Sequence, residues 1–313
     1  MRVLVTGGAG FIGSHVVDGL LTAGHEVAVI DNLSTGNRAN LNPSAAFHEV
    51  DVRDVEGVAR VFAGFRPEVV DHHAAQSEVP RSVTDPVFDA DVNLVGGVNL
   101  LRASVDAGVR KFVFISTGGA LYGEPDQVPC DEDHPVRPLS PYGTSKHCFE
   151  AYLGTFQRTF GLDHTVLRYA NVYGPRQDFA AEEGRVVAIF ASRMLAGRDV
   201  TIDGDGEQAR DLLHVADAVA ANLAVLERGS GRAYHVGTGI PVTVNHVFGL
   251  LSRLTGYGRP PLHGPGRRGD VRRIALDSSR AARELGWHPE MDLEAGLRTT
   301  VDHFREALAS GRG

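Results

Sequence analysis

The sequence lacks most of the features that mark secreted, membrane-embedded or nucleic-acid-binding proteins. It has only two cysteines, Cys130 and Cys148, which excludes a disulfide framework and fits a reducing compartment. No apolar run approaches the roughly twenty residues that a membrane-spanning helix needs. The formal net charge is −8 and no long basic cluster occurs, which argues against nucleic acid as a partner. We therefore expect a cytoplasmic protein without a leader peptide, a membrane span or a nucleic-acid partner.

Glycine, by contrast, is abundant, and three glycines stand close together near the start of the chain. Residues 2–6 form a short apolar run that predicts a buried parallel strand, and residues 12–21 show the apolar spacing of a helix. A glycine turn between a strand and a helix is typical of dinucleotide-binding sites. There Gly7 allows the tight turn, Gly10 lets a pyrophosphate approach the backbone, and Gly13 lets the helix pack on the strand. The turn residues expected at the cofactor are Gly7, Gly10, Phe11, Ile12 and Gly13.

The second predicted strand, residues 26–30, ends in an acidic residue, Asp31. A carboxylate at this place accepts hydrogen bonds from the adenosine ribose hydroxyls and repels a 2′-phosphate, which favours NAD over NADP. No arginine stands beside it, and Arg38 is the nearest. A third predicted strand, residues 47–50, ends where an adenine edge would lie. The cofactor contacts expected at this end of the site are Asp31, Asn32, Asp51 and Val52.

Strands and helices alternate along the first 170 residues, as in a parallel sheet covered by helices on both faces. We therefore predict the α/β fold class, with a doubly wound parallel sheet of Rossmann type as the NAD-binding domain over residues 1–170. Residues 171–313 are expected to form a smaller α/β substrate lobe that returns some segments to the sheet. Further strands are predicted at 68–71, 111–115 and 165–168, and helices at 54–65, 86–107, 141–160, 186–196, 215–228, 244–254 and 293–309.

Two of these helices, 86–107 and 141–160, carry more apolar residues than one core-facing side needs. One explanation is a homodimer whose subunits join through a four-helix interface. The other is that the C-terminal region covers the same helices. The sequence leaves both explanations open.

The residues that carry chemistry are Tyr142 and Lys146, at the start of the predicted helix 141–160. Residues four apart lie one turn apart on the same helix face, so the lysine cation can stand near the phenol. We expect this charge to lower the pKa of Tyr142 and make it a general base for a hydroxyl proton. The same lysine can reach a nicotinamide ribose hydroxyl.

Paired histidines, His72 and His73, follow the predicted strand 68–71 and raise the question of a metal site. No cysteine, aspartate or glutamate completes a ligand set at a suitable spacing, so no metal is expected. The small side chains of Ala74 and Ala75 would let the cofactor lie close to the backbone.

Together these motifs resemble the extended short-chain dehydrogenase/reductases, and within them the UDP-glucose 4-epimerase-like proteins. The resemblance covers nearly the whole chain and implies NAD-dependent chemistry on a nucleotide sugar. Its motifs lie at residues 6–13, 73–76, 116–123, 142–146, 171–177, 210–211 and 267–270.

The resemblance implies a role for each matching residue. Tyr142 would be the base and Lys146 its partner, and Arg210 with Arg267 would fork onto the substrate diphosphate. Asp270 would accept from the uridine ribose, and the backbone at 201–203 would meet the uracil. The cofactor pocket would include Ala74, Ala75, Asn93, Tyr142, Lys146 and Tyr169. The substrate residues would be Ser77, Thr117, Asn171, Arg185, Val187, Thr201, Asp203, Arg210, Arg267 and Asp270.

The loop after the predicted strand 111–115 indicates which reaction of the family the protein catalyses. Many relatives carry a Ser or Thr at the position of Gly118, so Thr117 is the nearest hydroxyl that could bridge a proton to Tyr142. Related dehydratases and decarboxylases carry acidic residues at the positions of Gly119 and Ala120. Elimination of water needs an acid and a base there, so the sequence favours epimerisation.

The sequence thus predicts a UDP-sugar 4-epimerase that inverts C4 through a transient 4-keto sugar, with UDP-glucose and UDP-galactose as substrates. Arg185 opens an alternative, because its guanidinium could fork onto the C6 carboxylate of UDP-glucuronate or UDP-galacturonate. A more distant alternative from another class is a non-catalytic, NAD-binding sensor on the same fold. The intact pair Tyr142 and Lys146 argues against the sensor.

Overall fold

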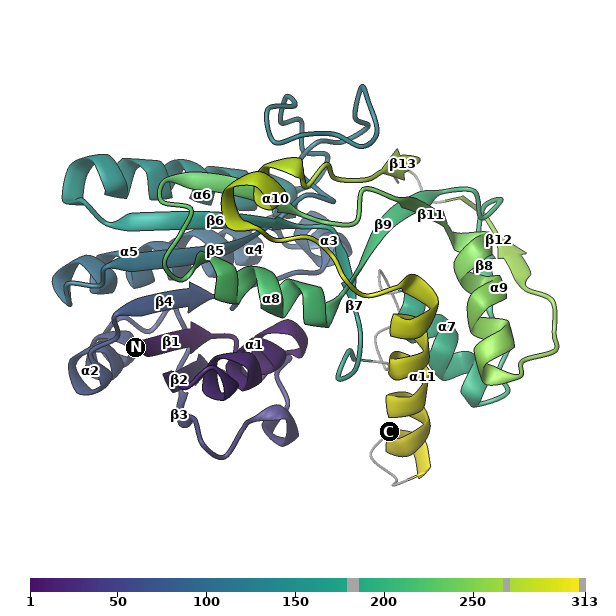
Figure 1. Cartoon of the computed structure of the whole chain (residues 1–313), viewed down its shortest axis with the longest axis horizontal. Helices are drawn as coiled ribbons and strands as arrows, with labels where there is room; N and C mark the ends of the chain where they lie inside the picture. Colours follow the sequence, from purple (N-terminus) through teal and green to yellow (C-terminus); the bar gives the residue numbers. More distant parts are fainter. Residues whose placement is uncertain (179–185, 267–270, 310–313) are drawn as a thin grey trace.

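The computed structural model describes residues 1–178, 186–266 and 271–309. Its centre is a seven-stranded parallel sheet in the order β10-β6-β5-β4-β1-β2-β3 (Figure 1). The order reverses at β1, whose carboxyl end lies where ligands bind in open α/β sheets. The predicted doubly wound α/β fold is confirmed. The strands are β1 (Arg2–Thr6), β2 (Glu26–Asp31), β3 (Ala46–Glu49), β4 (Val69–His72), β5 (Lys111–Thr117), β6 (Asp163–Tyr169) and β10 (Arg232–Val236).

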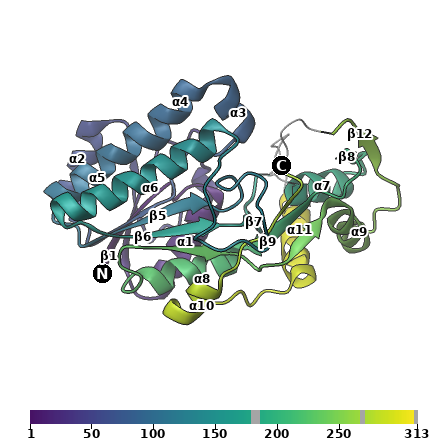
Figure 2. The same ribbon diagram turned by 90° about the horizontal axis from the view of Figure 1, so that it is seen from above.

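Helices cover both faces of this sheet, because successive side chains of a strand point to opposite sides. In β1, Val3 and Val5 pack toward α1 (Phe11–Thr22) and α8 (Val215–Val225), whereas Leu4 packs into a second core. Figure 2 shows the helices of that second face together on one side of the sheet. They are α2 (Val55–Phe65), α5 (Gly97–Asp106) and α6 (Pro141–Phe160).

A smaller lobe stands beside the carboxyl end of the sheet, on the right of Figure 1. Its own apolar core joins three helices, α7 (Val186–Leu195), α9 (Val244–Thr255) and α11 (Leu293–Ala309). Two small sheets complete the lobe. They consist of β7 (Asn171–Tyr173), β9 (Ala209–His214), β11 (Pro241–Thr243) and β13 (Arg273–Ile274), and of β8 (Thr201–Asp203) with β12 (Leu262–Gly264).

Part of the chain beyond residue 170 lies in the first layer rather than in the lobe. Strand β10 pairs with β6, and α8 packs on α1. Helix α10 (Ser279–Leu285) contacts β10. We propose that the NAD-binding domain ends at about residue 170, and that some segments of the following lobe return to its sheet.

Helix α6 has the bounds that its sequence predicts, because both ends carry strong local signals. Ser140 accepts a hydrogen bond from Gly143 N, and Pro141 occupies the first turn, where no N–H is needed. Gly161 ends the helix with φ +73°.

The predicted helix 86–107 is interrupted, in contrast. It consists of α4 (Pro86–Ala90), a wider π-helical turn η2 (Asp91–Gly96) and α5. Such turns are frequent at functional sites. Three short helices were not predicted: α3 (Val79–Thr84), the 3₁₀ turn η1 (Arg38–Asn40) and α10. Among the residues that the structure describes, no helix is both long enough and apolar enough to cross a membrane.

Candidate active site

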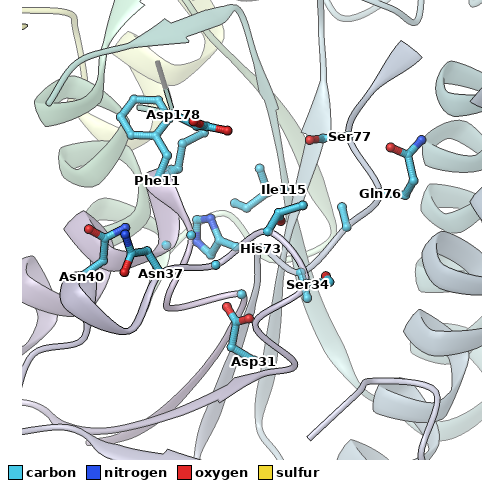
Figure 3. A pocket seen from close by; sticks show the side chains of 18 of the residues that line it. Phe11, Asp31, Ser34, Asn37, Asn40, His73, Gln76, Ser77, Ile115 and Asp178 are labelled. Atoms are coloured by element: carbon cyan, nitrogen blue, oxygen red, sulfur yellow. The ribbon is translucent and has the colours of Figure 1, made fainter. Parts of the chain in front are cut away.

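A cavity of about 1420 Å³ opens at the carboxyl ends of the central strands (Figure 3). The glycine turn, the ends of β2, β4, β5 and β6, and the start of α6 all contribute to its wall. Of the predicted cofactor residues, those that line it are Gly7, Gly10, Phe11, Ile12, Gly13, Asp31, Asn32, Asp51, Val52, Ala74, Ala75, Tyr142, Lys146 and Tyr169.

The glycine turn is tight, because no side chain could replace Gly7 or Gly13. Gly7 has φ +72°, and a Cβ there would lie 2.6 Å from Ala74 N. A Cβ on Gly13 would lie 2.2 Å from Gly7 O. Helix α1 begins after Gly10 without a capping side chain, so its first N–H groups remain available to a phosphate.

Asp31 shapes the same turn from the end of β2. Its Oδ2 accepts from Ala9 N at 3.0 Å and its Oδ1 from Leu33 N at 2.8 Å. The carboxylate lines the cavity, as Figure 3 shows, and keeps further lone pairs for ribose hydroxyls. The predicted role in NAD binding is therefore sterically and chemically feasible.

Asp51, at the adenine end, is held by a residue that the sequence did not single out. Arg53 donates to both of its carboxylate oxygens, at 2.9 and 2.8 Å, and Asn32 Nδ2 donates at 2.7 Å. These contacts hold the pKa of Asp51 well below its usual range, with the hydrogen bond from Arg53 as the largest cause. Arg53 also donates to Asp91 Oδ2 at 2.9 Å and lies over the Phe88 ring.

Tyr142 and Lys146 lie together at the cavity, but the expected lowering of the phenol pKa by the lysine charge is not observed. Lys146 Nζ donates to Ile115 O at 2.9 Å and lies 6.0 Å from the centre of the Tyr142 ring. Burial raises the pKa of Tyr142 to about 12, a hydrogen bond from Thr117 acts in the opposite sense, and the charge of Asp89 adds to the rise. Burial lowers the pKa of Lys146 to about 8.

Thr117 holds its hydroxyl at the Tyr142 phenol, and its role as a proton bridge stays a prediction. Its Oγ1 accepts from Ala120 N at 3.2 Å, and its hydroxyl is bonded to Tyr142. A Cβ at Gly118 would lie 2.3 Å from Leu276 Cδ1, so Leu276 would have to shift to admit a side chain at this position.

Asn93 does not line the cavity and supports it from behind. It is buried, and it both donates to Gln76 O and accepts from Gln76 N, each at 3.0 Å. Gln76 is itself part of the cavity wall. Asn93 thus positions the loop that follows β4.

The predicted substrate residues divide into three groups. Ser77, Thr117 and Asn171 line the cavity. Four others do not: Val187 lies in the core of the lobe, Thr201 and Asp203 belong to β8, and Arg210 Nη1 donates to Ala209 O. Arg185, Arg267 and Asp270 lie outside the described residues. Their substrate roles all remain predictions.

His73 is a cavity residue that the sequence analysis considered as a metal ligand and as the start of the motif 73–76, but did not assign to the site. Its ring stands in the cavity in Figure 3, and its Nε2 lies 3.1 Å from Asp71 Oδ1. The signal available in the sequence was its place one residue beyond β4, at the edge where ligands bind. Within 1–178, 186–266 and 271–309, no three His, Cys, Asp or Glu side chains gather as a metal site.

Three features meet at one cavity of the parallel sheet: a glycine turn, an acidic residue at the end of β2, and a Tyr-x-x-x-Lys pair. Together they define an NAD-dependent enzyme of the short-chain dehydrogenase/reductase class. The NAD dependent epimerase/dehydratase family model matches residues 3–237, and the chain belongs to that family.

Relatives with known names match almost from end to end. A UDP-glucose 4-epimerase from Mycolicibacterium smegmatis is 45% identical over 311 residues, covering 97% of this chain and 99% of the relative. A crystal structure of UDP-glucose 4-epimerase with UDP-glucose from Thermotoga maritima has a TM-score of 0.96 and 51% identity, covering 98% of this chain and 100% of that one. The Thermus thermophilus UDP-glucose 4-epimerase in complex with NAD has a TM-score of 0.93 and 48% identity, covering 98% and 100%.

Proposed function

We propose that this chain is an NAD-dependent UDP-sugar 4-epimerase that interconverts UDP-glucose and UDP-galactose. The observation that carries the proposal is the hydrogen-bonded pair Thr117 and Tyr142 at the NAD cavity, in a chain whose full length matches proteins of that name. A hydroxyl bridge to a buried phenol suits removal of a proton from a sugar hydroxyl.

In the proposed mechanism, Tyr142 accepts the proton of the C4 hydroxyl through Thr117 and later returns it to the C4 oxygen. Between these steps the 4-keto sugar turns, so that C4 would take its hydride back on the other face. NAD, when bound, supplies the hydride acceptor and a positive ring charge that favours the Tyr142 phenolate. Gly7, Gly10, Gly13 and Asp31 would hold it. Asn171 would steady the diphosphate while the sugar turns.

The loop 118–120 supports epimerisation over dehydration. It offers Gly118, Gly119 and Ala120, none of which can transfer a proton. A Cβ on Gly119 would lie 3.3 Å from Asn171 Oδ1, so even a small side chain would face that amide. Elimination of water would need an acid or base at this place.

A hexuronate substrate is the second candidate. It rests on Arg185, which lies outside the described residues. The full-length relatives are named for UDP-glucose, and this favours the neutral sugar. Comparing kcat/KM for UDP-galactose and UDP-galacturonate, in the wild type and in Arg185→Ala, separates the two.

We also propose that two copies form a homodimer through the interrupted helix α4–η2–α5 and helix α6. Large apolar side chains are exposed there: Val87 on α4 is 77% exposed, Val95 on η2 is 52% exposed and Tyr152 on α6 is 45% exposed. The C-terminal segments that could have covered them pack elsewhere, α11 against α7 and α9. A cytoplasmic location is likewise proposed, on the two cysteines, which are both free thiols.

The test is to incubate the purified protein with UDP-galactose without adding NAD. Formation of UDP-glucose is the expected result, because the cofactor is regenerated in each turnover. A protein that holds NAD but leaves UDP-galactose unchanged would contradict the proposal and favour the sensor.

A further inference from the structure

A fully buried carboxylate, Asp89 on α4, lies behind the Tyr142–Lys146 pair. Among the residues that the structure describes, the donors to its carboxylate are all neutral. Gln76 Nε2 and Asn93 Nδ2 donate to Oδ1 at 2.9 and 3.0 Å, and Ser145 Oγ donates to Oδ2 at 2.7 Å. A buried carboxylate without an arginine or lysine in hydrogen-bond contact is costly, and its charge acts strongly on its surroundings.

These donors come from three segments that meet at the cavity. Gln76 lies in the loop after β4 and lines the cavity, and Asn93 lies in η2. Ser145 precedes Lys146 on α6. Asp89 therefore ties the cavity loop to the helix that carries both reacting side chains.

The charge of Asp89 acts on Lys146 and favours its ammonium form. It is buried, its Nζ donates to Ile115 O at 2.9 Å, and it lies 4.7 Å from the centre of the Phe114 ring. Burial lowers the pKa of Lys146 to about 8, and the charges of Asp89 and Glu150 oppose that lowering.

The other charged and titratable groups around Lys146 stabilise its positive charge less than Asp89 does. Glu150, one turn further along α6, is already paired with Arg168 at 2.6 Å. His72, from β4, has its pKa held well below its usual range by burial and by Lys146, so it is neutral. Tyr142 is also neutral, because burial raises its pKa to about 12. Asp89 is the remaining negative charge.

We propose that Asp89 is a positioning residue of the reaction, which keeps the proton on Lys146 and fixes the cavity loop against α6. Lys146 then retains the ammonium that can donate to a ribose hydroxyl of the cofactor and stabilise the Tyr142 phenolate. This inference rests on the proposed function only for its effect on turnover.

The charge of Asp89 acts on both reacting groups in the same direction. It raises the pKa of Lys146 and the pKa of Tyr142. Removing it lowers both values, so Lys146 loses its proton at a lower pH and Tyr142 ionises at a lower pH.

The chain has only two lysines, Lys111 and Lys146, which makes a direct measurement possible. Protein labelled with an isotope only at lysine gives two ε-amino signals by NMR, assigned with Lys111→Arg. In Asp89→Asn the pKa of Lys146 should fall by about one unit, the usual effect of losing a nearby opposite charge. Lys111, at the opposite end of β5, should titrate as in the wild type and reports an intact fold.

Ser145→Ala is the matched control, because it removes a hydrogen bond to Asp89 and leaves the charge. An unchanged pKa of Lys146 in Asp89→Asn would overturn the proposal. An equal fall in Asp89→Asn and Ser145→Ala would also overturn it, because the effect would then come from the bond. If Asp89→Asn does not fold, Asp89→Ser removes the same charge with a smaller polar side chain.

Turnover of UDP-galactose adds a second measurement. In Asp89→Asn both limbs of the pH profile of kcat should move to lower pH by about one unit, whereas Ser145→Ala should keep the wild-type midpoints. A lower maximal kcat with unchanged midpoints of the pH profile would contradict the role of the Asp89 charge. A wild-type protein without epimerase activity would refute the proposed function, and the NMR titration would still decide the role of Asp89.

Discussion

At the scale of single residues, Tyr142 and Lys146 show how one cause moves two pKa values in opposite directions. Burial disfavours the charged form of each group, so it raises the pKa of the phenol and lowers that of the amine. The two pKa values, about 12 and about 8, are therefore further apart than those of the free groups, which both lie near 10. The phenol stays neutral until a positive charge, such as that of the bound cofactor, lowers its pKa.

Tyr142→Phe should leave the fold and NAD content unchanged and reduce kcat by at least ~10²-fold, because the general base is lost. The ring and its packing stay in place. Tyr152→Phe, a change on an exposed part of α6, serves as the control and should keep wild-type turnover. Turnover near the wild-type value in Tyr142→Phe would remove Tyr142 from the mechanism.

Thr117→Val is nearly isosteric, and it should reduce kcat by roughly 10-fold or more, because the hydroxyl bonded to Tyr142 disappears. Thr117→Ser keeps a hydroxyl and should retain most of the activity. Steady-state kinetics of both variants checks this. Equal activity of the Val and Ser variants would show that Tyr142 reaches the sugar unaided.

At the scale of elements, the glycine turn joins β1 and α1 so closely that its geometry depends on missing side chains. Gly13→Ala should lower both NAD content and the free energy of unfolding, because the new Cβ would lie 2.2 Å from Gly7 O. Thermal unfolding and cofactor content of the purified variant measure the effect. Gly64→Ala on α2 has open space around its Cβ and should be neutral or stabilising by about 0.5–1 kcal/mol. Full NAD content in Gly13→Ala would contradict the close contact.

Local signals decide which elements the sequence could predict. Helix α6 has a serine cap, a proline in its first turn and a glycine at its end, and its predicted bounds are confirmed. The π-helical turn at Asp91–Gly96 has no such signal, because it accompanies long-range bonds from Asn93 to Gln76. Strands of two or three residues, such as β13, are too short to show a period of two.

The same limit applies to the site. Gly7, Asp31 and Tyr142 could be found because each belongs to a motif with fixed spacing. Asp89 lies one helical turn before Asn93, but its contact with Ser145, 56 residues later, depends on the packing of α4 against α6. A pattern along the sequence cannot show which buried carboxylate lies behind a catalytic pair.

At the scale of the whole molecule, the exposed apolar side chains on α4, η2 and α6 are the basis of the proposed dimer. Val87→Asp should convert a dimer to a monomer, because a charge would have to be buried in the interface. Light scattering after size-exclusion chromatography measures the mass. Val55→Asp, on α2 and 61% exposed, is the control and should leave the mass unchanged. A wild-type protein that elutes as a monomer would contradict the proposed dimer.

The burial of both lysines has a consequence for handling the protein. Lys111 Nζ donates to Arg228 O, and Lys146 lies at the cavity. All the other residues counted as Lys or Arg are arginines. A guanidinium does not react with amine-coupling esters. Coupling to beads, fluorophores or cross-linkers through lysine would therefore fail on the outer surface. A reactive analogue of the cofactor would instead attach to one lysine, Lys146, whose pKa of about 8 supplies the free amine under mild conditions.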